Sequence, residues 1–380
     1  TLNSRSNLLG GSLLALTGPT TLDESLGTRS GAVSAITAQA APGFLRPRIL
    51  PPADLAKTSD WRAKIRDLAP IALSSDVRFL GGSPNWLLIF LDEVARVSGR
   101  QGHGLVDWFP NLDLIAHGGV NFAPYRRRFT ELLDGSKAET RELYSASEGV
   151  FAYADRGDGE GLRLHLGGQV FFEFVPVETI DNARPVRHWI GTAETEVDYA
   201  LAISTAAGLW SYLLGDVVRF VSIAPPRLLV IDRLMHGVSF FGEHLIESEI
   251  ADAIAEAANS VDRNVLDYTI GVAPAPAGNR HSYLVETDMP VSPIALDTFA
   301  RTLDQALCAS NKDYAELRNA DYALGAPRIV NVAPGGFTAW MEARGKLGGQ
   351  NKVPRVVREE AEFAKITDFF ETNGFVGPDQ

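Results

Sequence analysis

Short runs of apolar residues, each bounded by turn-forming residues, fill the middle of the chain between residues 143 and 231. Runs of this length that are rich in β-branched and aromatic residues are typical of β-strands. The pattern predicts strands at 150–151, 162–166, 170–175, 199–203, 217–221 and 228–231. This part of the chain is therefore predicted to form a sheet of short strands.

A helical period precedes this region. Leu87, Leu88, Leu91 and Val94 recur at the spacing of one buried helical face. Ser83 suits the capping position and the proline after it suits the first helical position, so we expect a helix over 84–97. Residues 1–70 are rich in Gly, Ser, Thr and Pro and show few clear periods.

Helix and strand patterns alternate in the last third of the chain. The spacing predicts a helix at 246–258, strands at 268–272 and 282–285, a long helix at 296–317 and a strand at 329–332. Such alternation indicates a compact α/β or α+β unit. With a boundary near residues 234–243, we predict a mixed α/β protein with a large domain at 1–240 and a small domain at 241–380.

Charge narrows the range of partners. The chain of 380 residues has a formal net charge of −12 and a pI near 5.1. Such an acidic chain is a poor nucleic-acid binder unless it carries a local basic stripe. The dense basic run, Arg126 to Arg128, falls in a helical pattern and is predicted to be a solvated face. We therefore expect no nucleic-acid partner, and a monomer.

Cys308 is the single cysteine, which excludes an internal disulfide and a thiolate metal cage and favours a cytoplasmic location. The longest apolar runs, such as 86–91, are too short to cross a bilayer, and the N-terminus lacks the pattern of a signal peptide. No membrane partner is expected. Because the chain begins at Thr1 rather than methionine, we expect it to be a trimmed or truncated piece of a longer protein.

Several common catalytic motifs are absent. The sequence contains no GxxxxGK[ST] phosphate loop, no GxSxG elbow, no HExxH pair and no Cys-His cluster. The stretch GDGEG at 157–161 resembles a nucleotide-binding glycine loop. No helix pattern follows it, so a hairpin turn is the favoured interpretation.

Small residues follow a predicted strand at 144–149, which reads YSASEG. Small residues let a ligand approach the backbone, whose N–H groups can meet phosphate oxygens. Glu148 has the chemistry of a Mg²⁺ ligand. The alternative is a plain β-turn.

A single carboxylate, Asp216, interrupts the apolar stretch 204–222 directly after Gly215. The segment is either a hairpin corner or a site at which Asp216 holds a ligand. An acidic residue at a strand can accept hydrogen bonds from both hydroxyls of a ribose. Thr205 and Tyr212 belong to the same segment.

Two basic positions are further candidates. Arg233 follows a predicted strand and has the fixed charge needed to bridge phosphate or ribose oxygens. Gly345, Gly348 and Gly349 form a loop that carries Lys346 and Lys352. A lysine on a flexible loop can neutralise a phosphoryl transition state, although a surface lysine is the alternative.

The order of these segments resembles the auxin-responsive acyl acid–amido synthetase family, specifically its bacterial members. The family patterns YxASEG, TTxxGLxRYxxGDVV, GRxxxxxxFFGEHL, NxxYxxxR and GGQxKVPR correspond here to residues 144–149, 204–218, 233–245, 311–318 and 348–355. The similarity extends from about residue 80 to the end of the chain.

The resemblance implies an acyl-adenylate-forming fold, with a large N-terminal domain, a small mobile C-terminal domain and the nucleotide between them. It also implies ATP and Mg²⁺ as cofactors, and a small carboxylic acid and an amine, such as an amino acid, as substrates. The residues that it assigns to the nucleotide are Tyr144, Ser145, Ala146, Ser147, Glu148, Thr205, Tyr212, Asp216 and Arg233, with Glu148 near Mg²⁺. Lys352 corresponds to the lysine that completes the adenylation site.

The acyl pocket is expected to draw on Trp86, His117, Gly118, Gly119 and Phe122, although each of these residues is equally compatible with a core position.

Three departures from the family pattern favour keeping a second hypothesis. The family's Ser/Gly/Thr-rich phosphate loop is expected ahead of Thr1, although 16–21 (LTGPTT) and 26–31 (LGTRSG) have a similar composition. Ser211 stands where the family has arginine, and Asp232, which replaces a glycine, is expected to compete for Arg233. We therefore retain a non-catalytic nucleotide- or acyl-binding protein beside the ligase, and an acyl–CoA ligase as the nearest enzymatic alternative.

Overall fold

The computed structural model describes residues 7–25, 28–31, 33–99, 104–157, 159–234, 238, 240, 241, 243, 245–272, 280–318, 324–348 and 351–377. Residues 235–237, 239 and 242 of the predicted domain boundary lie outside this part, as do Gly349 of the lysine-bearing loop, Leu26 and Gly27.

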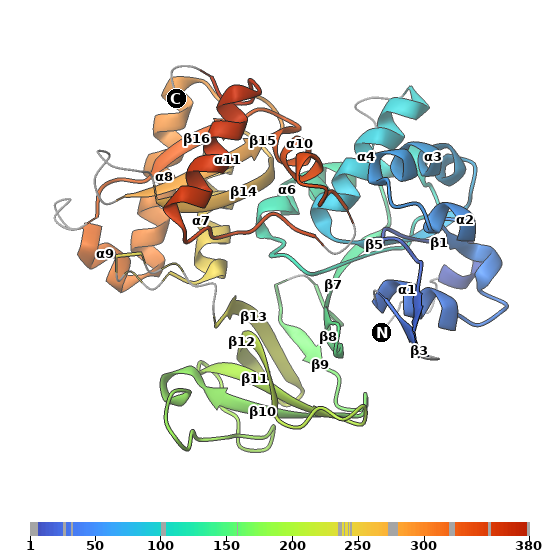
Figure 1. The fold of residues 1–380 in the computed structure, drawn as a ribbon, viewed down its shortest axis with the longest axis horizontal. Helices are drawn as coiled ribbons and strands as arrows, with labels where there is room; N and C mark the ends of the chain where they lie inside the picture. The colour runs from blue at the N-terminus through green and yellow to red at the C-terminus, as the bar shows by residue number, and fades with distance from the viewer. Residues whose placement is uncertain are drawn as a thin grey trace.

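The largest sheet of the described residues has 11 strands and changes character at its middle (Figure 1). One half is parallel and consists of β4 (Ile49–Leu50), β1 (Ser12–Ala15), β5 (Val77–Gly82), β6 (Leu114–His117) and β7 (Glu139–Ala146). The other half is antiparallel and continues through β8 (Gly149–Tyr153), β9 (Leu162–Leu164), β13 (Pro226–Arg233), β12 (Tyr212–Ile223), β11 (Asp198–Thr205) and β10 (Val170–Pro176). This large mixed sheet confirms the predicted mixed α/β class.

Helices α3 (Trp61–Leu73), α4 (Pro84–Ser98) and α6 (Ala123–Leu132) share a hydrophobic core with the parallel strands. The predicted helix 84–97 is α4, and its fully buried residues Leu87, Phe90 and Val94 form the expected face. Ser83 occupies the N-cap, but its hydroxyl donates to Asn85 Oδ1 at 2.7 Å and caps no backbone N–H. The helix is therefore held mainly by packing and by the proline at its start.

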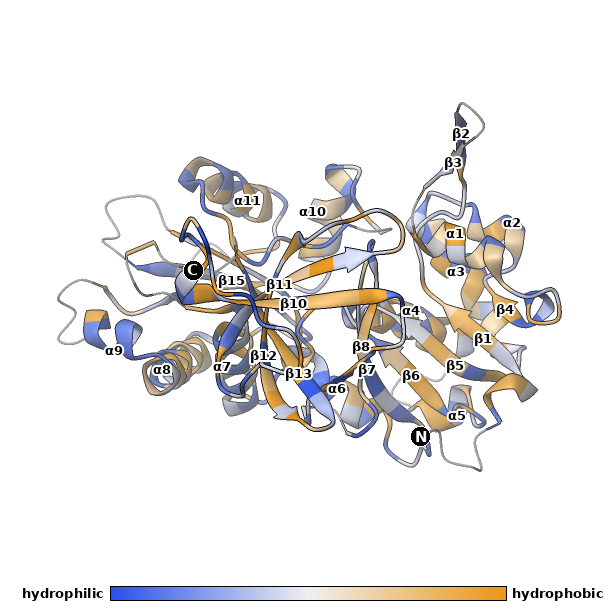
Figure 2. Cartoon of the chain, turned by 90° about the horizontal axis from the view of Figure 1, so that it is seen from below, coloured by the Kyte–Doolittle hydropathy of each residue, from blue (hydrophilic) through white to orange (hydrophobic). Residues whose placement is uncertain are grey.

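A separate aromatic core holds the antiparallel half together. Phe174 and Phe220 pack edge to face with their ring centroids 4.8 Å apart, and Phe151 and Tyr199 belong to the same cluster. In Figure 2 the strands β10 and β6 are largely hydrophobic in colour, as expected for strands that pack on a core. The GDGEG stretch, of which Asp158 lies outside the described residues, joins β8 to β9, which pair antiparallel, so its prediction as a hairpin turn is confirmed.

A second sheet contains β14 (Val265–Val272), β15 (His281–Thr287) and β16 (Arg328–Val332). Successive residues of β15 face opposite sides: Tyr283 packs with α7 (Glu247–Ser260) and α8 (Pro293–Ser310), and Leu284 packs with α10 (Gly336–Ala343) and α11 (Glu360–Thr372). The strands are thus covered by helices on both faces (Figure 1).

The remaining elements are short. They are η1 (Leu8–Gly10), β2 (Asp23–Ser25), β3 (Thr28–Ser30), α1 (Val33–Ala40), η2 (Arg46–Arg48), α2 (Ala53–Ala56), α5 (Leu105–Trp108), η3 (Val177–Thr179) and α9 (Lys312–Arg318). No helix within the described ranges is both long enough and apolar enough to span a membrane.

The prediction of one long helix over 296–317 is wrong. The structure has two helices, α8 and α9, which meet at Asn311. Asn311 has extended dihedral angles, and its Oδ1 accepts a hydrogen bond from Tyr314 N at 2.8 Å. The side chain therefore caps α9, and the apolar period continues across a break in the backbone.

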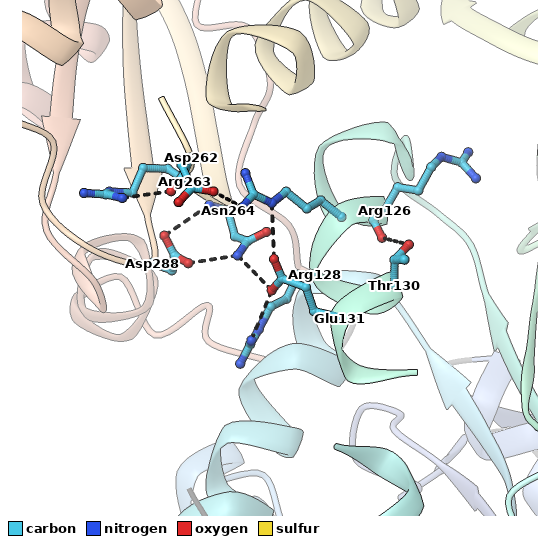
Figure 3. A network of polar contacts seen from close by, with 9 residues as sticks. Arg126, Arg128, Thr130, Glu131, Asp262, Arg263, Asn264 and Asp288 are labelled. Carbon is cyan, nitrogen blue, oxygen red and sulfur yellow. Dashed lines mark hydrogen bonds and ion pairs between the residues drawn. The ribbon is translucent and has the colours of Figure 1, made fainter. Parts of the chain in front are cut away.

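The prediction that Arg126–Arg128 form a solvated face is also wrong in part. Arg127 pairs with Glu131 on its own helix and with Asp262, which follows α7 (Figure 3). Arg128 lies 3.5 Å from Glu131, whose Oε2 also accepts from Asn264 Nδ2 at 3.2 Å. Arg127 and Arg128 thus belong to a polar network that joins α6 to the segment between α7 and β14, whereas Arg126 is exposed.

Candidate functional site

A cleft of about 2700 Å³ lies at the carboxyl ends of the parallel strands. The residues that follow β5, β6 and β7 line it, among them Ser83, Gly119 and Glu148. The first turns of α7 and the segment that carries Lys352 form the opposite wall. In sheets that contain parallel strands, ligands bind at this edge, because the loops there converge.

His117, Gly118 and Gly119 bring the end of β6 to the floor of the cleft. His117 is buried and its ring stacks on Phe122 at a centroid distance of 3.9 Å. Gly118 packs directly against the Leu143 carbonyl of β7, where a methyl group would overlap the oxygen, and Gly119 has φ +84°. The sequence prediction placed these four residues in the acyl pocket, and the structure brings all four to the cleft.

The segment 144–149 is a tight hairpin between β7 and β8. Ala146 pairs with Gly149, so Ser147 and Glu148 are the two loop residues. Both alternatives from the sequence therefore describe it: the segment is a β-turn, and Tyr144, Ser145, Ala146, Ser147 and Glu148 all line the cleft. Its backbone and its one carboxylate face the space in which a ligand would bind.

Asp216 is buried at the cleft and lies within β12, at a bulge. Ala200 and Ala202 of β11 pair with Val217 and Leu213, so the register shifts between them, and Gly215 has φ +89°. The hairpin-corner interpretation is therefore wrong. Extra residues in a strand redirect the neighbouring side chains, and glycine tolerates the positive φ that this requires.

Two residues from other strands, Tyr144 of β7 and Arg233 of the neighbouring β13, hold the Asp216 carboxylate. Tyr144 Oη donates to Oδ2 at 2.7 Å, and Arg233 Nε lies 3.0 Å from Oδ1. Burial and the negative charge of Asp216 raise the pKa of Tyr144, which keeps the phenol protonated as a donor. Half of the Arg233 side chain remains exposed, so its guanidinium still has donors that face the solvent.

Asp232 does not compete for Arg233 as expected. Its Oδ1 accepts from Glu247 N, 3.4 Å away in the first turn of α7, whereas the Arg233 guanidinium pairs with Asp216. Successive residues of a strand point to opposite faces, which separates the two side chains. Burial raises the pKa of Asp232 to about 6.

Lys352 reaches the same cleft from the C-terminal part of the chain. Its Nζ donates to the carbonyl oxygen of Gly119, at the end of β6. Protein atoms around the amine, and the charges of Arg233 and Arg355, lower its pKa. The structure thus brings Lys352 together with the Asp216 cluster, which lies more than a hundred residues away in sequence.

Three predicted site residues lie elsewhere. Trp86 is buried against Trp61, with the ring centroids 4.8 Å apart, so it belongs to the core. Thr205 lines a small surface hollow beside Trp210, and Tyr212 is exposed at the other end of β12. Tyr212 is not among the residues that line the cleft beside Asp216. Ser211 lies beside Tyr212 and bonds to Glu173 Oε2 at 2.6 Å.

Sequence reasoning assigned no role to several residues that line the cleft. They are Thr20, Arg126, Glu247, Glu249 and Asp252, together with Leu16 and Thr17 at the end of β1. A usable signal existed only for Leu16, Thr17 and Thr20, because 16–21 had the composition of a phosphate loop. The structure places that stretch beside the cleft, on the side of the parallel strands.

A magnesium ion fits this donor set only together with a ligand's own oxygens. Within the described ranges, no three His, Cys, Asp or Glu side chains cluster as a metal site. Glu148 supplies one carboxylate, and Mg²⁺ commonly takes one or two carboxylates and completes its shell with phosphate oxygens and water.

Comparisons with known proteins agree with this geometry. Residues 164–233 match the GH3 family central domain, and residues 248–361 match the GH3 family C-terminal domain. Over these two ranges the chain is therefore similar to the GH3 family. This confirms the resemblance seen in the motifs.

Two plant relatives that match the chain are both indole-3-acetic acid-amido synthetases. The chain is 30% identical over 202 residues to an indole-3-acetic acid-amido synthetase GH3.8 of Oryza sativa subsp. indica, an alignment that covers 49% of this chain and 33% of that protein. It is 24% identical over 348 residues to indole-3-acetic acid-amido synthetase GH3.3 of Arabidopsis thaliana, covering 87% of this chain and 57% of that one. The aligned part thus spans about a third to just over half of these relatives.

Solved structures share the fold. A GH3.15 acyl acid amido synthetase superposes with a TM-score of 0.78 at 16% identity, over 98% of this chain and 76% of that one. A 2-hydroxyisobutyryl-CoA ligase in a postadenylation state superposes with a TM-score of 0.60 at 14% identity, over 95% and 68% of the two chains. The predicted acyl-adenylate-forming fold is therefore confirmed.

Proposed function

We propose that the chain is an ATP-dependent ligase that activates a carboxylic acid as its acyl adenylate and transfers the acyl group to an amine, such as that of an amino acid. The observation that carries the proposal is the meeting of Asp216, Arg233 and Lys352 at one cleft, at the carboxyl ends of the parallel strands. The named relatives, which are amido synthetases, support the choice of acyl acceptor.

The held carboxylate suits a ribose. Asp216 accepts one hydrogen bond from Tyr144 and one from Arg233, so its orientation is set before a ligand arrives. Each carboxylate oxygen can accept a second hydrogen bond, which matches the two neighbouring hydroxyls of a ribose. The hairpin at Ser147 and Glu148 then lies along the phosphates, where Mg²⁺ bound by Glu148 would neutralise part of their charge.

The acid lies on the other side of the proposed nucleotide position, near His117, Gly119 and Phe122. Attack of its carboxylate oxygen on the α-phosphorus forms the new phosphorus–oxygen bond and releases pyrophosphate. The ammonium of Lys352 lines the cleft, and it stabilises the negative charge that develops on the phosphoryl oxygens. The amine then displaces AMP from the acyl carbon. A monomeric state and a cytoplasmic location are part of the same proposal.

Pyrophosphate release with ATP, Mg²⁺ and a panel of carboxylic acids tests the proposal directly. We expect release that depends on the acid, and an amide product by mass spectrometry when amino acids are supplied. A thioester formed only with coenzyme A would assign the chain to the acyl–CoA ligases. Nucleotide binding without any pyrophosphate release would support the non-catalytic alternative.

Lys352→Ala provides the residue-level test. Losing one preorganised donor to a transition state costs about 10²–10³-fold in rate. We expect a loss of that size in pyrophosphate release, with nucleotide affinity changed much less, because the Asp216 cluster remains. Lys346→Ala, in an exposed lysine of the same loop, is the matched control and should release pyrophosphate at the parental rate.

A further inference from the structure

Residues 354–357, which begin two positions after Lys352, are attached to the edge of the small sheet. Ile270 N donates to Arg355 O at 2.9 Å, and Val357 N donates to Ile270 O at 2.8 Å, which adds the segment in parallel to β14. Thr269 Oγ1 also donates to Pro354 O at 2.7 Å. The backbone that follows Lys352 therefore moves with β14.

The Arg355 side chain crosses from this segment to α6. Its Nη2 donates to Tyr125 Oη at 2.9 Å, and its Nη1 donates to Tyr268 O at 2.9 Å and pairs with Asp267. The guanidinium also lies 4.2 Å from the centroid of the Tyr268 ring. The side chains of Arg355 and Asp267 are both nearly buried. A buried ion pair is stable only when its remaining donors also have well-placed hydrogen-bond partners.

Lys352 and Arg355 therefore both contact the short segment 119–125, which runs from the end of β6 into α6. Lys352 meets Gly119, at the end of β6, and Arg355 meets Tyr125, in the first turn of α6 six residues later. Only two residues separate Lys352 from Arg355. Because the connecting backbone is so short, the position of Arg355 restricts the positions that Lys352 can reach.

We propose that Arg355, held by Tyr125 and Asp267, is a positioning residue that fixes Lys352 at the cleft when β14 is docked against α6. It touches no part of the proposed ligand position, and it acts through the lysine. The inference rests on the proposed function only for its catalytic consequence, because the placement of Lys352 can be measured without turnover.

Tyr125→Phe is the sharpest variant, since it removes one hydroxyl and keeps the fully buried ring and the charge of Arg355. Tyr283→Phe is its matched control. Tyr283 is also fully buried, and its hydroxyl has no hydrogen-bond partner among the described residues. Both variants should fold, and any general effect of losing a buried hydroxyl appears in both.

The first measurement is the pH dependence of Lys352 acetylation by an amine-reactive ester, followed by peptide mass spectrometry on the full chain. In the parental chain the amine contacts the carbonyl oxygen of Gly119, with Arg233 and Arg355 nearby and with Glu247 and Asp216 as the opposing charges. We expect its acetylation midpoint to lie below that of Lys346. In Tyr125→Phe it should rise toward the midpoint of Lys346, and in Tyr283→Phe it should stay. An unchanged midpoint in Tyr125→Phe would overturn the inference, whether or not the chain is a ligase.

The second measurement is a double-mutant cycle on acid-dependent pyrophosphate release. A small misplacement of a catalytic group costs up to about 10²-fold in rate. We expect Tyr125→Phe to lower kcat by roughly tenfold or more while KM for ATP changes little. The same substitution in a Lys352→Ala background should cause almost no further loss. Equal losses in both backgrounds would contradict a role through Lys352, and no turnover in the parental chain would contradict the proposed function alone.

Discussion

Asp216 is a nearly buried carboxylate whose two oxygens have partners on two other strands. The bulge at Gly215 turns it toward Tyr144, and the pairing of β12 with β13 places Arg233 opposite it. Burying a charge is costly unless it is paired and hydrogen-bonded, and here both conditions are met. The arrangement sets the direction of the carboxylate before any ligand binds.

Asp216→Asn should weaken nucleotide binding before it affects the chemical step. A hydrogen bond to a charged group contributes about 1.5–3 kcal/mol, so affinity for ATP is expected to fall by roughly tenfold to a hundredfold. Isothermal titration calorimetry measures this directly, with a thermal unfolding curve to show that the chain remains folded.

Thr205→Ala is the control at this scale. Thr205 belongs to the same sequence motif but lies outside the cleft. Its removal should leave the affinity unchanged. Equal weakening by Thr205→Ala and Asp216→Asn would show that the motif, and not the cleft, defines the nucleotide site.

At the level of elements, the sequence predicts best where one face of an element is buried. Helix α4 was found because Leu87, Leu91 and Val94 repeat on a single face. Helix α3 was missed because Lys64 and Pro70 interrupt its apolar period. Lys64 is nevertheless buried, and its Nζ reaches the Ala56 carbonyl at 3.0 Å. That contact depends on a tertiary neighbour, which no local pattern reveals.

The site follows the same rule. That Tyr144, Asp216 and Arg233 line one cleft was predictable, because motif order identified segments that tertiary structure brings together, but the direct Asp216–Arg233 pair was not predicted. Thr205 and Tyr212 lie in the same motif as Asp216, and the strand carries them away from the cleft. A sequence motif indicates which segment lies near a site. The alternation of side chains along the strand, together with the bulge, determines which side chains of that segment face the cleft.

Gly118→Ala tests how closely β6 and β7 must approach at the cleft. The added methyl would overlap the carbonyl oxygen of Leu143, which belongs to the backbone and cannot rotate away. Overpacking of this kind costs about 1–3 kcal/mol, so the melting temperature should fall.

Gly43→Ala makes the same chemical change at a glycine that has no neighbour within 4 Å and no unusual φ. Differential scanning fluorimetry of the two variants separates local crowding from the general effect of adding a methyl. If Gly118→Ala were as stable as Gly43→Ala, the close approach of β6 and β7 would be refuted.

On the scale of the whole molecule, separate hydrophobic cores meet at polar contacts. The parallel half of the large sheet and the small sheet each have their own apolar cluster. Between them lies the network around Glu131, which accepts from Asn264 and pairs with Arg127 and Arg128 (Figure 3). Polar contacts of this kind form and break more readily than a shared apolar core.

Glu131→Ala should therefore loosen the docking of the small sheet and leave both cores intact. Glu131 is partly exposed, and exposed ion pairs contribute at most about 1 kcal/mol each, so the melting temperature should change little. The radius of gyration from small-angle X-ray scattering should instead increase.

Salt screens such contacts, so raising the ionic strength should expand the parental chain toward the dimensions of the variant and change the variant less. Glu139→Ala, which removes a surface pair with Arg141 within β7, is the control and should scatter like the parental chain. Identical scattering by all three chains at low and high salt would mean that the network does not hold the two parts together, and that Arg355 and its partners supply the docking contact by themselves.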